Sequence, residues 1–317
     1  MTQSTAVITV RGLCKSYRGV RAVDGIDFDV GPGEVFALLG PNGAGKTTTI
    51  EILEGYRHRD AGEVTVLGQD PAHAGAAWRA RVGVVLQEAT DAGLLTVEET
   101  VRHFAGYYPE PRDPDEVIEM VGLAEKRASR VRKLSGGQRR RLDVALGILG
   151  GPDLVFMDEP TTGFDPEARR RFWGVIRSLA ADGTTVLLTT HYLGEAEALA
   201  DRVAVIAAGR VVAHGKPSEV GGRALAEATV QWLVDGVTRT ERTANPTEVV
   251  VRLAGHFGGD VPGLSVHQPT LEDTYLELVG RGITDSGGPS SETPAGGPAN
   301  GAVVASRVAS QPEGQST

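Results

Sequence analysis

The segment Gly40-Pro41-Asn42-Gly43-Ala44-Gly45-Lys46-Thr47 decides the fold of this chain. It fits the pattern G-x-x-x-x-G-K-[ST] and lies between an apolar run at 35–39 and a helical stretch at 48–53. Glycines let the backbone curl so that its N–H groups converge on phosphate oxygens, and the following helix presents its positive end to the same anion. We therefore predict a nucleotide site, with Lys46 on the β- and γ-phosphates and Thr47 on Mg²⁺.

A glycine-rich turn that carries a lysine by chance is the alternative interpretation of this loop. The whole chain contains only five lysines. A lysine at this one place is therefore improbable by chance, on the order of one in a hundred. Nucleotide binding remains the favoured interpretation.

Short apolar runs that alternate with helical stretches predict an α/β fold with parallel strands, buried on both faces. The runs lie at 35–39, 82–86, 154–157, 185–189 and 203–206. Between about residues 88 and 140 the pattern becomes helical, with apolar spacing at 97–108 and 115–121, and it predicts an inserted helical subdomain. The core sheet and this insertion make up a nucleotide-binding domain at 5–220.

Two further segments follow this domain. Residues 230–234 have a strand pattern and residues 246–256 and 271–279 a helical one, which predicts a small α+β accessory domain at 221–281. Residues 282–317 are rich in Gly, Pro, Ser, Thr and Ala and contain no aromatic residue. Such a composition buries too little surface to offset its ordering entropy, so we expect a disordered tail.

Composition excludes several classes of protein. No apolar run approaches the roughly 20 residues that span a bilayer, and residues 1–10 lack the pattern of a secretory signal, so we expect a cytoplasmic protein. The single cysteine fits a reducing compartment. A net charge of -9 argues against a general nucleic-acid binder. The arginine triplets at 139–141 and 169–171 are interpreted as a solvated or subunit-facing surface.

Two acids, Asp158 and Glu159, follow the apolar run at 154–157. Ligands of open α/β sheets bind at this edge, where the strands end. Asp158 is suited to the Mg²⁺ shell and Glu159 to general-base activation of a water molecule. The alternative is a pair of acids that merely begins a loop.

The segment Leu134-Ser135-Gly136-Gly137-Gln138 precedes a helical stretch at 139–149. Small residues and N–H donors at a helix start predict a second phosphate site. One nucleotide uses both sites of one subunit only if they are adjacent. The second site therefore raises the possibility that it serves the nucleotide of a partner.

These residues together resemble the nucleotide-binding domain of ABC ATPases over residues 7–215, and the resemblance implies a P-loop α/β fold with a mixed sheet core and an inserted helical subdomain. Leu134 to Gln138 match the family signature, Tyr17 the adenine-stacking position, Gln87 the Q-loop and His191 the switch histidine, while the D-loop falls at 163–165. The D-loop carries Phe164 where the family usually has leucine.

The resemblance implies catalytic roles for Glu159, His191, Gln87 and Lys46 and a metal shell of Thr47, Gln87 and Asp158. The residues expected to bind ATP are Tyr17, Gly40, Pro41, Asn42, Gly43, Ala44, Gly45, Lys46, Thr47, Thr48, Ser135, Gly137 and Gln138.

The same resemblance implies a homodimer that sandwiches two ATP molecules and a separate multi-span membrane permease that holds the chain at the inner face of the membrane. Residues 269–278 resemble the end of daunorubicin-resistance-type exporter ATPases, which favours export of a drug, antibiotic or lipid-like molecule. Two rivals are a soluble ABC ATPase acting on nucleic acid or ribosomes and a regulatory module that binds ATP without hydrolysis. The first typically has two cassettes or a coiled-coil insertion, and the second typically lacks Glu159 or His191.

Overall fold

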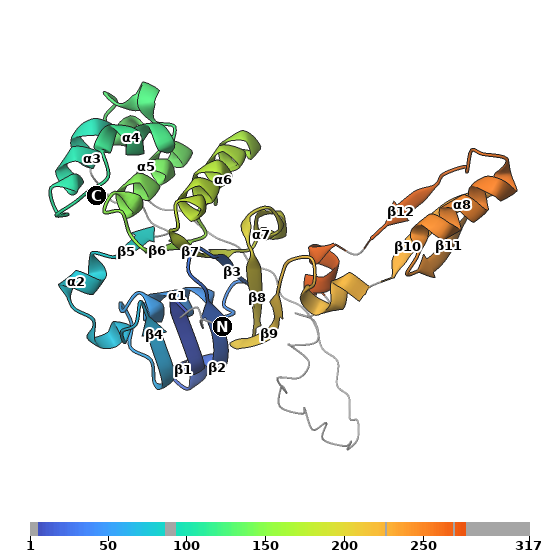
Figure 1. Ribbon diagram of the computed structural model, residues 1–317, viewed down its shortest axis with the longest axis horizontal. Helices are drawn as coiled ribbons and strands as arrows, with labels where there is room; N and C mark the ends of the chain where they lie inside the picture. Colours follow the sequence, from blue (N-terminus) through green and yellow to red (C-terminus); the bar gives the residue numbers. More distant parts are fainter. Residues whose placement is uncertain (1–5, 86–92, 226, 269, 277–317) are drawn as a thin grey trace, which may run out of the picture. The chain divides into compact units, whose positions relative to one another are not determined.

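The computed structural model describes residues 6–85, 93–225, 227–268 and 270–276. A six-stranded sheet in the order β5-β6-β7-β3-β8-β9 forms the centre of the fold (Figure 1). All neighbouring strands are parallel except the pair β8 and β9. The strands are β3 (Val35–Leu39), β5 (Val82–Val85), β6 (Leu154–Asp158), β7 (Thr185–Thr190), β8 (Arg202–Ala207) and β9 (Arg210–Gly215). The predicted α/β class with a mixed sheet is confirmed.

Side chains of the central strands alternate between two hydrophobic clusters, because successive residues of a strand point to opposite faces. Along β3, Val35, Ala37 and Leu39 belong to one cluster, whereas Phe36 and Leu38 belong to the other. Strand β6 divides in the same way. The central sheet is therefore a middle layer with both faces buried, as the uniformly apolar runs predicted.

A second, antiparallel sheet covers one of these faces. Its order is β2-β1-β4, with β1 (Ile8–Tyr17), β2 (Val20–Val30) and β4 (Ala61–Val66). Phe28 of β2 stacks on Phe36 of β3 with the ring centroids 5.4 Å apart. The apolar residues of α1 (Lys46–Leu53) and Trp78 of the short α2 (Ala76–Arg79) complete this cluster.

Helices cover the other face of the central sheet: α3 (Val97–Ala105), α4 (Pro114–Met120), α5 (Gly136–Ile148), α6 (Pro166–Ala181) and α7 (Leu193–Leu199). The helix predicted at 97–108 ends earlier, with Gly106 as its C-cap. The helix predicted at 139–149 starts earlier, because Ser135 and Gln138 form a reciprocal capping box in front of it. Among the described residues, no helix is long and apolar enough to cross a bilayer.

The accessory segment forms a third sheet, β11-β10-β12, with β10 (Ala228–Val234), β11 (Val237–Thr243) and β12 (Ser265–His267). Helix α8 (Pro246–Phe257) packs on it through a cluster of Val230, Val249, Leu253 and Val261. Residues 271–276 are helical, but Leu271 packs into the cluster that contains α5, α6 and α7. Gln87 and the tail at 282–317 lie outside the described residues.

Candidate active site

The loop before α1 is shaped by glycines that no other residue replaces without a clash. Gly45 has a φ of 106°, and a Cβ placed on it would meet the carbonyl oxygen of Ala22 at 2.4 Å. A Cβ on Gly40 would meet the carbonyl oxygen of Ile206 at the same distance of 2.4 Å. The close approach of three backbone segments therefore fixes the loop.

Lys46 begins α1 and points back into its own loop. Its Nζ donates to the carbonyl oxygens of Gly40, at 2.8 Å, and Pro41, at 3.2 Å. Burial lowers the pKa of Lys46, and the carboxylates of Glu159 and Asp158 oppose that shift. The side chain is only 6% exposed, so its charge is held inside the loop beside the carbonyl oxygens of Gly40 and Pro41.

Asp158 ends β6 and is held on both carboxylate oxygens. The Thr47 hydroxyl donates to Oδ2 at 3.1 Å, and the hydroxyl of Thr189 on β7 donates to Oδ1. Both partners are uncharged, so the carboxylate is oriented without being neutralised. A hydroxyl and a carboxylate at this separation are hard oxygen donors of the kind that Mg²⁺ binds together with phosphates and water.

Glu159 occupies a strained position directly after β6. Its φ of 45° is rare for a residue other than glycine, and its N–H is held by Thr189 Oγ1 at 2.9 Å. The turn directs one carboxylate oxygen to 3.9 Å from Lys46 Nζ and the other to 3.3 Å from His191 Nδ1. Such strain is found where a side chain must be aimed, as at active sites.

His191 follows β7 and is held on a second side by aromatic contacts. Its ring centroid lies 4.1 Å from that of Tyr192. The guanidinium of Arg169 on α6 lies over the same tyrosine, 4.4 Å from its ring centroid. Tyr192 thus packs between a cation and an imidazole and restrains the histidine beside Glu159.

A cavity of about 470 Å³ brings together many of the predicted residues: Tyr17, Asn42, Gly43, Gly45, Lys46, Thr47, Thr48 and Glu159, with Ala22 beside them. Tyr17 forms one wall, and the guanidinium of Arg57 lies 5.2 Å from its ring centroid. An exposed aromatic face next to a phosphate-type loop suits a purine ring.

The signature residues do not line this cavity. Ser135 accepts a hydrogen bond from Gln138 N–H at 3.2 Å, and Gln138 Oε1 accepts one from Ser135 N–H at 3.0 Å. A Cβ on Gly137 would lie 3.6 Å from the ring of Phe164, which is itself packed edge-to-face on Phe172. The D-loop phenylalanine is thus a buried packing residue beside the signature.

Two functional contacts were missed by the motifs. Arg140, placed by the sequence on a solvated or subunit-facing surface, is 8% exposed and donates to the carbonyl oxygens of Asp158 at 2.6 Å and Pro160 at 3.2 Å. That interpretation is therefore wrong for Arg140, because α5 faces the loop after β6. Thr189, which orients both acids, carried no signal beyond its place in an apolar strand.

Comparisons with known proteins agree with this geometry. The sequence pattern of the ABC transporter family matches residues 23–162. The chain is 38% identical to the daunorubicin/doxorubicin resistance ATP-binding protein DrrA of Streptomyces peucetius, over 90% of this chain and 96% of the relative. It is 40% identical to Nod factor export ATP-binding protein I of Ralstonia nicotianae, over 89% and 96%.

Solved structures share the fold. An ATP-binding subunit of an ABC transporter superposes with a TM-score of 0.63 at 24% identity, covering 86% of this chain and 99% of its own. A dimeric cassette in a post-hydrolysis state, bound to ADP and phosphate, gives a TM-score of 0.60 at 23% identity, over 66% of this chain and 98% of its own. With the near full-length relatives, these matches confirm the expected resemblance. The chain belongs to the ABC transporter family, as an ATP-binding subunit with ATPase activity.

Proposed function

We propose that this chain energises a membrane exporter by hydrolysing ATP at the site built from Lys46, Glu159 and His191. The observation that carries this proposal is the position of the Glu159 carboxylate, with one oxygen 3.9 Å from the Lys46 ammonium and the other 3.3 Å from His191 Nδ1. A base placed between a phosphate-binding cation and a histidine is suited to activate water against a γ-phosphate.

In this mechanism the loop amides at residues 40–47 and Lys46 bind the β- and γ-phosphates, and Tyr17 stacks on adenine. Phosphate oxygens then replace the carbonyls of Gly40 and Pro41 as acceptors from Lys46. Glu159 takes a proton from the attacking water, and His191 keeps that carboxylate aimed. The water oxygen bonds to the γ-phosphorus as the bond from that phosphorus to the β,γ-bridging oxygen breaks, so that ADP leaves and inorganic phosphate is formed. The backbone N–H groups and Lys46 stabilise the negative charge that develops on the β-phosphate of the departing ADP.

Thr47 and Asp158 would hold Mg²⁺, with Gln87 as a further ligand. Among the described residues, no cluster of three or more His, Cys, Asp or Glu side chains is arranged to hold a metal ion. The ion would therefore depend on phosphate oxygens and water as well as on protein, which is how Mg²⁺ is usually bound in nucleotide sites. When bound, it neutralises charge between the β- and γ-phosphates.

The signature residues support a homodimer. Ser135, Gly137 and Gln138 begin α5 but do not line the cavity around Lys46. Their N–H groups at a helix start are suited to an anion from elsewhere. We propose that they contact the γ-phosphate bound by a second copy, so that two ATP molecules lie between two subunits.

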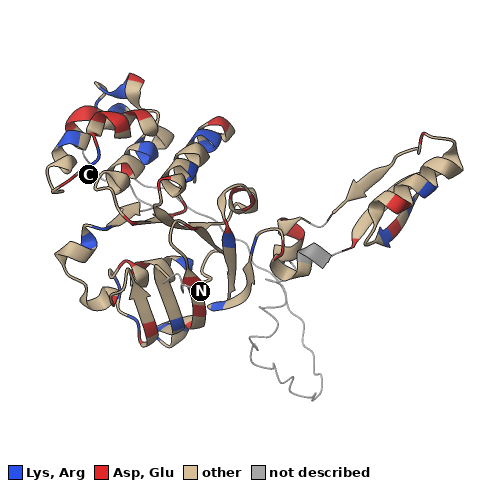
Figure 2. Cartoon of the chain, viewed as in Figure 1, with Lys and Arg blue, Asp and Glu red and all other residues tan. Residues whose placement is uncertain are grey.

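The exporter assignment rests on the relatives. Both sequence relatives match almost this entire chain, and their names describe drug resistance and Nod factor export. We propose a drug, antibiotic or lipid-like substrate, and a separate multi-span permease that holds this cytoplasmic subunit at the inner face of the membrane. Basic and acidic residues are interspersed over the described elements (Figure 2), which fits a role without nucleic acid.

The permease is proposed to dock beside the helical subdomain. Leu94 is 74% exposed and Leu95 is 38% exposed, and both lie just before α3, while Phe104 of α3 is partly buried against the core. Contiguous exposed apolar patches mark protein contacts, and these adjacent leucines are suited to form part of such a contact. Glu88, expected in the same surface, lies outside the described residues.

The decisive experiment is Glu159→Gln, with Glu63→Gln on the exposed side of β4 as the matched control. Glu159→Gln keeps the shape of the side chain but removes the base, so we expect unchanged ATP affinity and ATP hydrolysis that falls about 100- to 1000-fold. Nucleotide titration and phosphate release measure the two quantities. Hydrolysis at the parent rate in Glu159→Gln would show that another group activates the water.

A further inference from the structure

Arg140, near the start of α5, holds the main chain on both sides of the residue assigned as the general base. Its Nη2 donates to the carbonyl oxygen of Asp158 at 2.6 Å, and its Nε donates to that of Pro160 at 3.2 Å. These two residues are the neighbours of Glu159 in the sequence. One buried guanidinium therefore spans the turn that carries the catalytic carboxylate.

The peptide unit that joins Asp158 to Glu159 is held at both of its polar ends. Its carbonyl oxygen accepts from Arg140 on α5, and its N–H donates to Thr189 Oγ1 on β7 at 2.9 Å. A peptide unit is planar and rigid, so hydrogen bonds at its two ends fix its orientation. The angle between that plane and the rest of Glu159 is its φ of 45°. The two hydrogen bonds thus hold the backbone angle that aims the carboxylate.

A restraint is also needed on the other side of the base. A residue with a side chain keeps left-handed backbone only where the contacts around it impose that conformation. The carbonyl oxygen of Glu159 accepts a longer hydrogen bond, 3.3 Å, from the N–H of Thr162. Pro160 follows the base and has no N–H to donate. The hydrogen bond from Arg140 Nε to the carbonyl oxygen of Pro160 therefore restrains the chain where it leaves Glu159.

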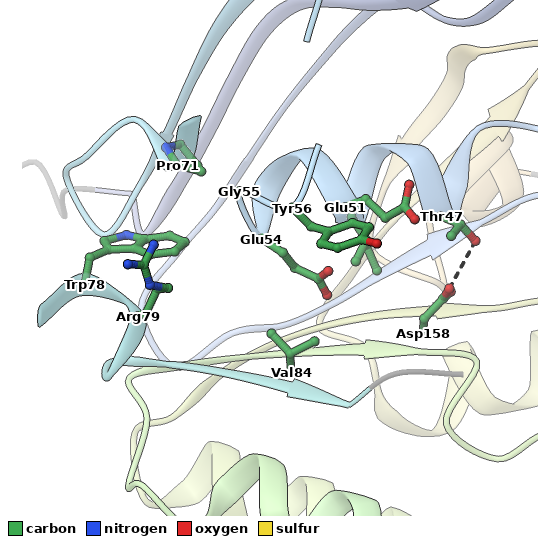
Figure 3. Close-up of a pocket in the computed structure, with 11 residues that line it drawn as sticks. Thr47, Glu51, Glu54, Gly55, Tyr56, Pro71, Trp78, Arg79, Val84 and Asp158 are labelled. Atoms are coloured by element: carbon green, nitrogen blue, oxygen red, sulfur yellow. Dashed lines mark hydrogen bonds between the residues drawn. The ribbon is translucent and has the colours of Figure 1, made fainter. Parts of the chain in front are cut away.

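The same contact fixes the residue that carries the carboxylate next to Thr47. Figure 3 shows Asp158 facing Thr47 at the start of α1, with the hydrogen bond between Thr47 Oγ1 and Asp158 Oδ2 as a dashed line. The other carboxylate oxygen of Asp158 accepts from Thr189. Its carbonyl oxygen is held by Arg140. The side chain of Asp158 is thus held from α1 and β7 and its main chain from α5, so the turn into Glu159 starts from a fixed point.

Stability does not explain why a guanidinium is buried at this place. Burial lowers the pKa of Arg140, and the carboxylates of Asp143, Asp158 and Glu159 oppose that shift. Its Nη1 is buried and has no hydrogen-bond partner in the part of the chain that the structure describes. A buried donor without an acceptor is destabilising, and such groups are uncommon in native proteins. The position of Arg140 is better explained by the loop that it holds.

We propose that Arg140 is a positioning residue for ATP hydrolysis, which clamps the backbone around Glu159 so that its carboxylate stays aimed at the attacking water. The inference rests on the proposed function, because it needs Glu159 to be the general base. It goes further by assigning the aim of that base to a side chain of α5. A planar guanidinium presents its donors in a fixed fork, which suits two carbonyl oxygens of one loop. Arg140 does not line the cavity around Lys46, so it acts through Glu159 rather than on ATP.

The test compares Arg140→Met with the control Arg141→Met in the complete chain. Methionine fills much of the same apolar space and removes the guanidinium. We expect Arg140→Met to lower kcat about 10- to 100-fold and to keep ATP affinity within about twofold, because a displaced base slows the chemical step without weakening phosphate binding. Phosphate release and nucleotide titration measure the two quantities.

Arg141 is a matched control because it is the next residue of the same helix and also donates to carbonyl oxygens. Its partners are Val121, at 3.4 Å, and Gly122, at 2.8 Å, and neither belongs to the loop after β6. Arg141→Met should therefore keep kcat within about twofold of the parent. A parent kcat in Arg140→Met, or an equal loss of kcat in the two variants, would overturn the inference.

A double-variant cycle distinguishes the aim of the base from a general loss of structure. In Glu159→Gln the base is already absent, so adding Arg140→Met should lower the residual single-turnover rate less than about twofold further. A residue that only stabilises the cassette would lower the rate by the same factor in both backgrounds, and that result would also overturn the inference. Hydrolysis at the parent rate in Glu159→Gln would overturn the proposed function itself.

Arg140→Lys keeps the test decisive if Arg140→Met does not fold. Lysine retains a buried cation but lacks the planar fork, so we expect kcat to fall about three- to tenfold with unchanged ATP affinity. A folded Arg140→Lys with the parent kcat, beside an Arg140→Met that does not fold, would limit Arg140 to a role in folding and overturn the inference.

Discussion

The central sheet and the accessory sheet differ in how much of each strand is buried. Every residue of β3, β6 and β7 is buried, because an antiparallel sheet covers one face and helices cover the other. In the accessory sheet, β12 is exposed along its length and β11 is mostly exposed, with α8 as its packing partner. The central sheet, covered by a layer on each face, is a rigid platform. The accessory sheet, covered only by α8, is a small unit with one exposed face that is available for contacts.

This difference in burial explains why the candidate active site lies on the central sheet. The predicted catalytic and metal-binding residues that the structure describes follow β3, β6 and β7 at the edge where these parallel strands end. Loops at that edge inherit the rigidity of the buried strands, which is what a strained residue such as Glu159 requires. The accessory sheet has no comparable set of converging side chains among its described residues, so we expect its role to be contact rather than catalysis.

The largest difference between the two regions should appear in nucleotide affinity. Lys46→Ala removes a buried ammonium from the phosphate loop, and we expect ATP affinity to fall about 10- to 100-fold, as for a charge-assisted hydrogen bond. Lys216→Ala, between the two regions in the chain, removes an ammonium that is 65% exposed and should leave affinity unchanged. Titration with a fluorescent ATP analogue measures both. Equal losses in the two variants would deny Lys46 a specific role.

The second largest difference between the two regions should appear in their stability. Phe156 of β6 is fully buried, and Phe156→Ala should lower the free energy of unfolding of the cassette by about 3–5 kcal/mol. Leu253 of α8 belongs to a cluster of four buried residues, and Leu253→Ala should cost about 2 kcal/mol, confined to the accessory unit. Hydrogen exchange followed by mass spectrometry resolves the two regions. Faster exchange across the central strands in Leu253→Ala would mean that the regions unfold as one.

The same contrast explains what the sequence could predict. A fully buried strand is a continuous apolar run, so the central strands at 35–39, 154–157, 185–189 and 203–206 were confirmed, as was the accessory strand at 230–234 within β10. The exposed strand β11 reads Val-Thr-Arg-Thr-Glu-Arg-Thr and carries no apolar signal, although it pairs with β10 along seven residues. Its structure comes from pairing, which a local pattern does not show.

The site was predictable to the extent that its chemistry is local. The phosphate loop is one continuous segment, and the structure places Lys46, Thr47 and Glu159 around one cavity. Arg140 escaped prediction because its contacts depend on which loop α5 faces after folding. Hydrogen bonds from a side chain to distant carbonyl oxygens are tertiary features, and no spacing of residues in the sequence predicts them.

The smallest effect should come from removing the tail. A chain that ends after residue 282 loses a segment rich in Gly, Pro, Ser, Thr and Ala, a composition from which we expect little buried surface. We expect its melting temperature and ATPase rate to match those of the full chain, with less than about 0.5 kcal/mol of difference in stability. Loss of the permease from the purified complex on this cut alone would show instead that the tail tethers the partner.

A cut after residue 221 is the informative counterpart, because it removes more than the accessory sheet. Leu271 is fully buried in the cluster around α5, α6 and α7, and its N–H donates to Glu197 Oε1 on α7 at 3.3 Å. Helix α7 follows the loop of His191, so this cut exposes an apolar surface next to the switch residue. We expect a lower melting temperature together with impaired assembly.

The point variant Leu271→Ala separates loss of the Leu271 contact from loss of the accessory sheet. It should lower cassette stability by about 2–3 kcal/mol while the accessory sheet stays folded. If Leu271→Ala left the melting temperature unchanged, the effects of the cut after residue 221 would come from loss of the accessory sheet alone.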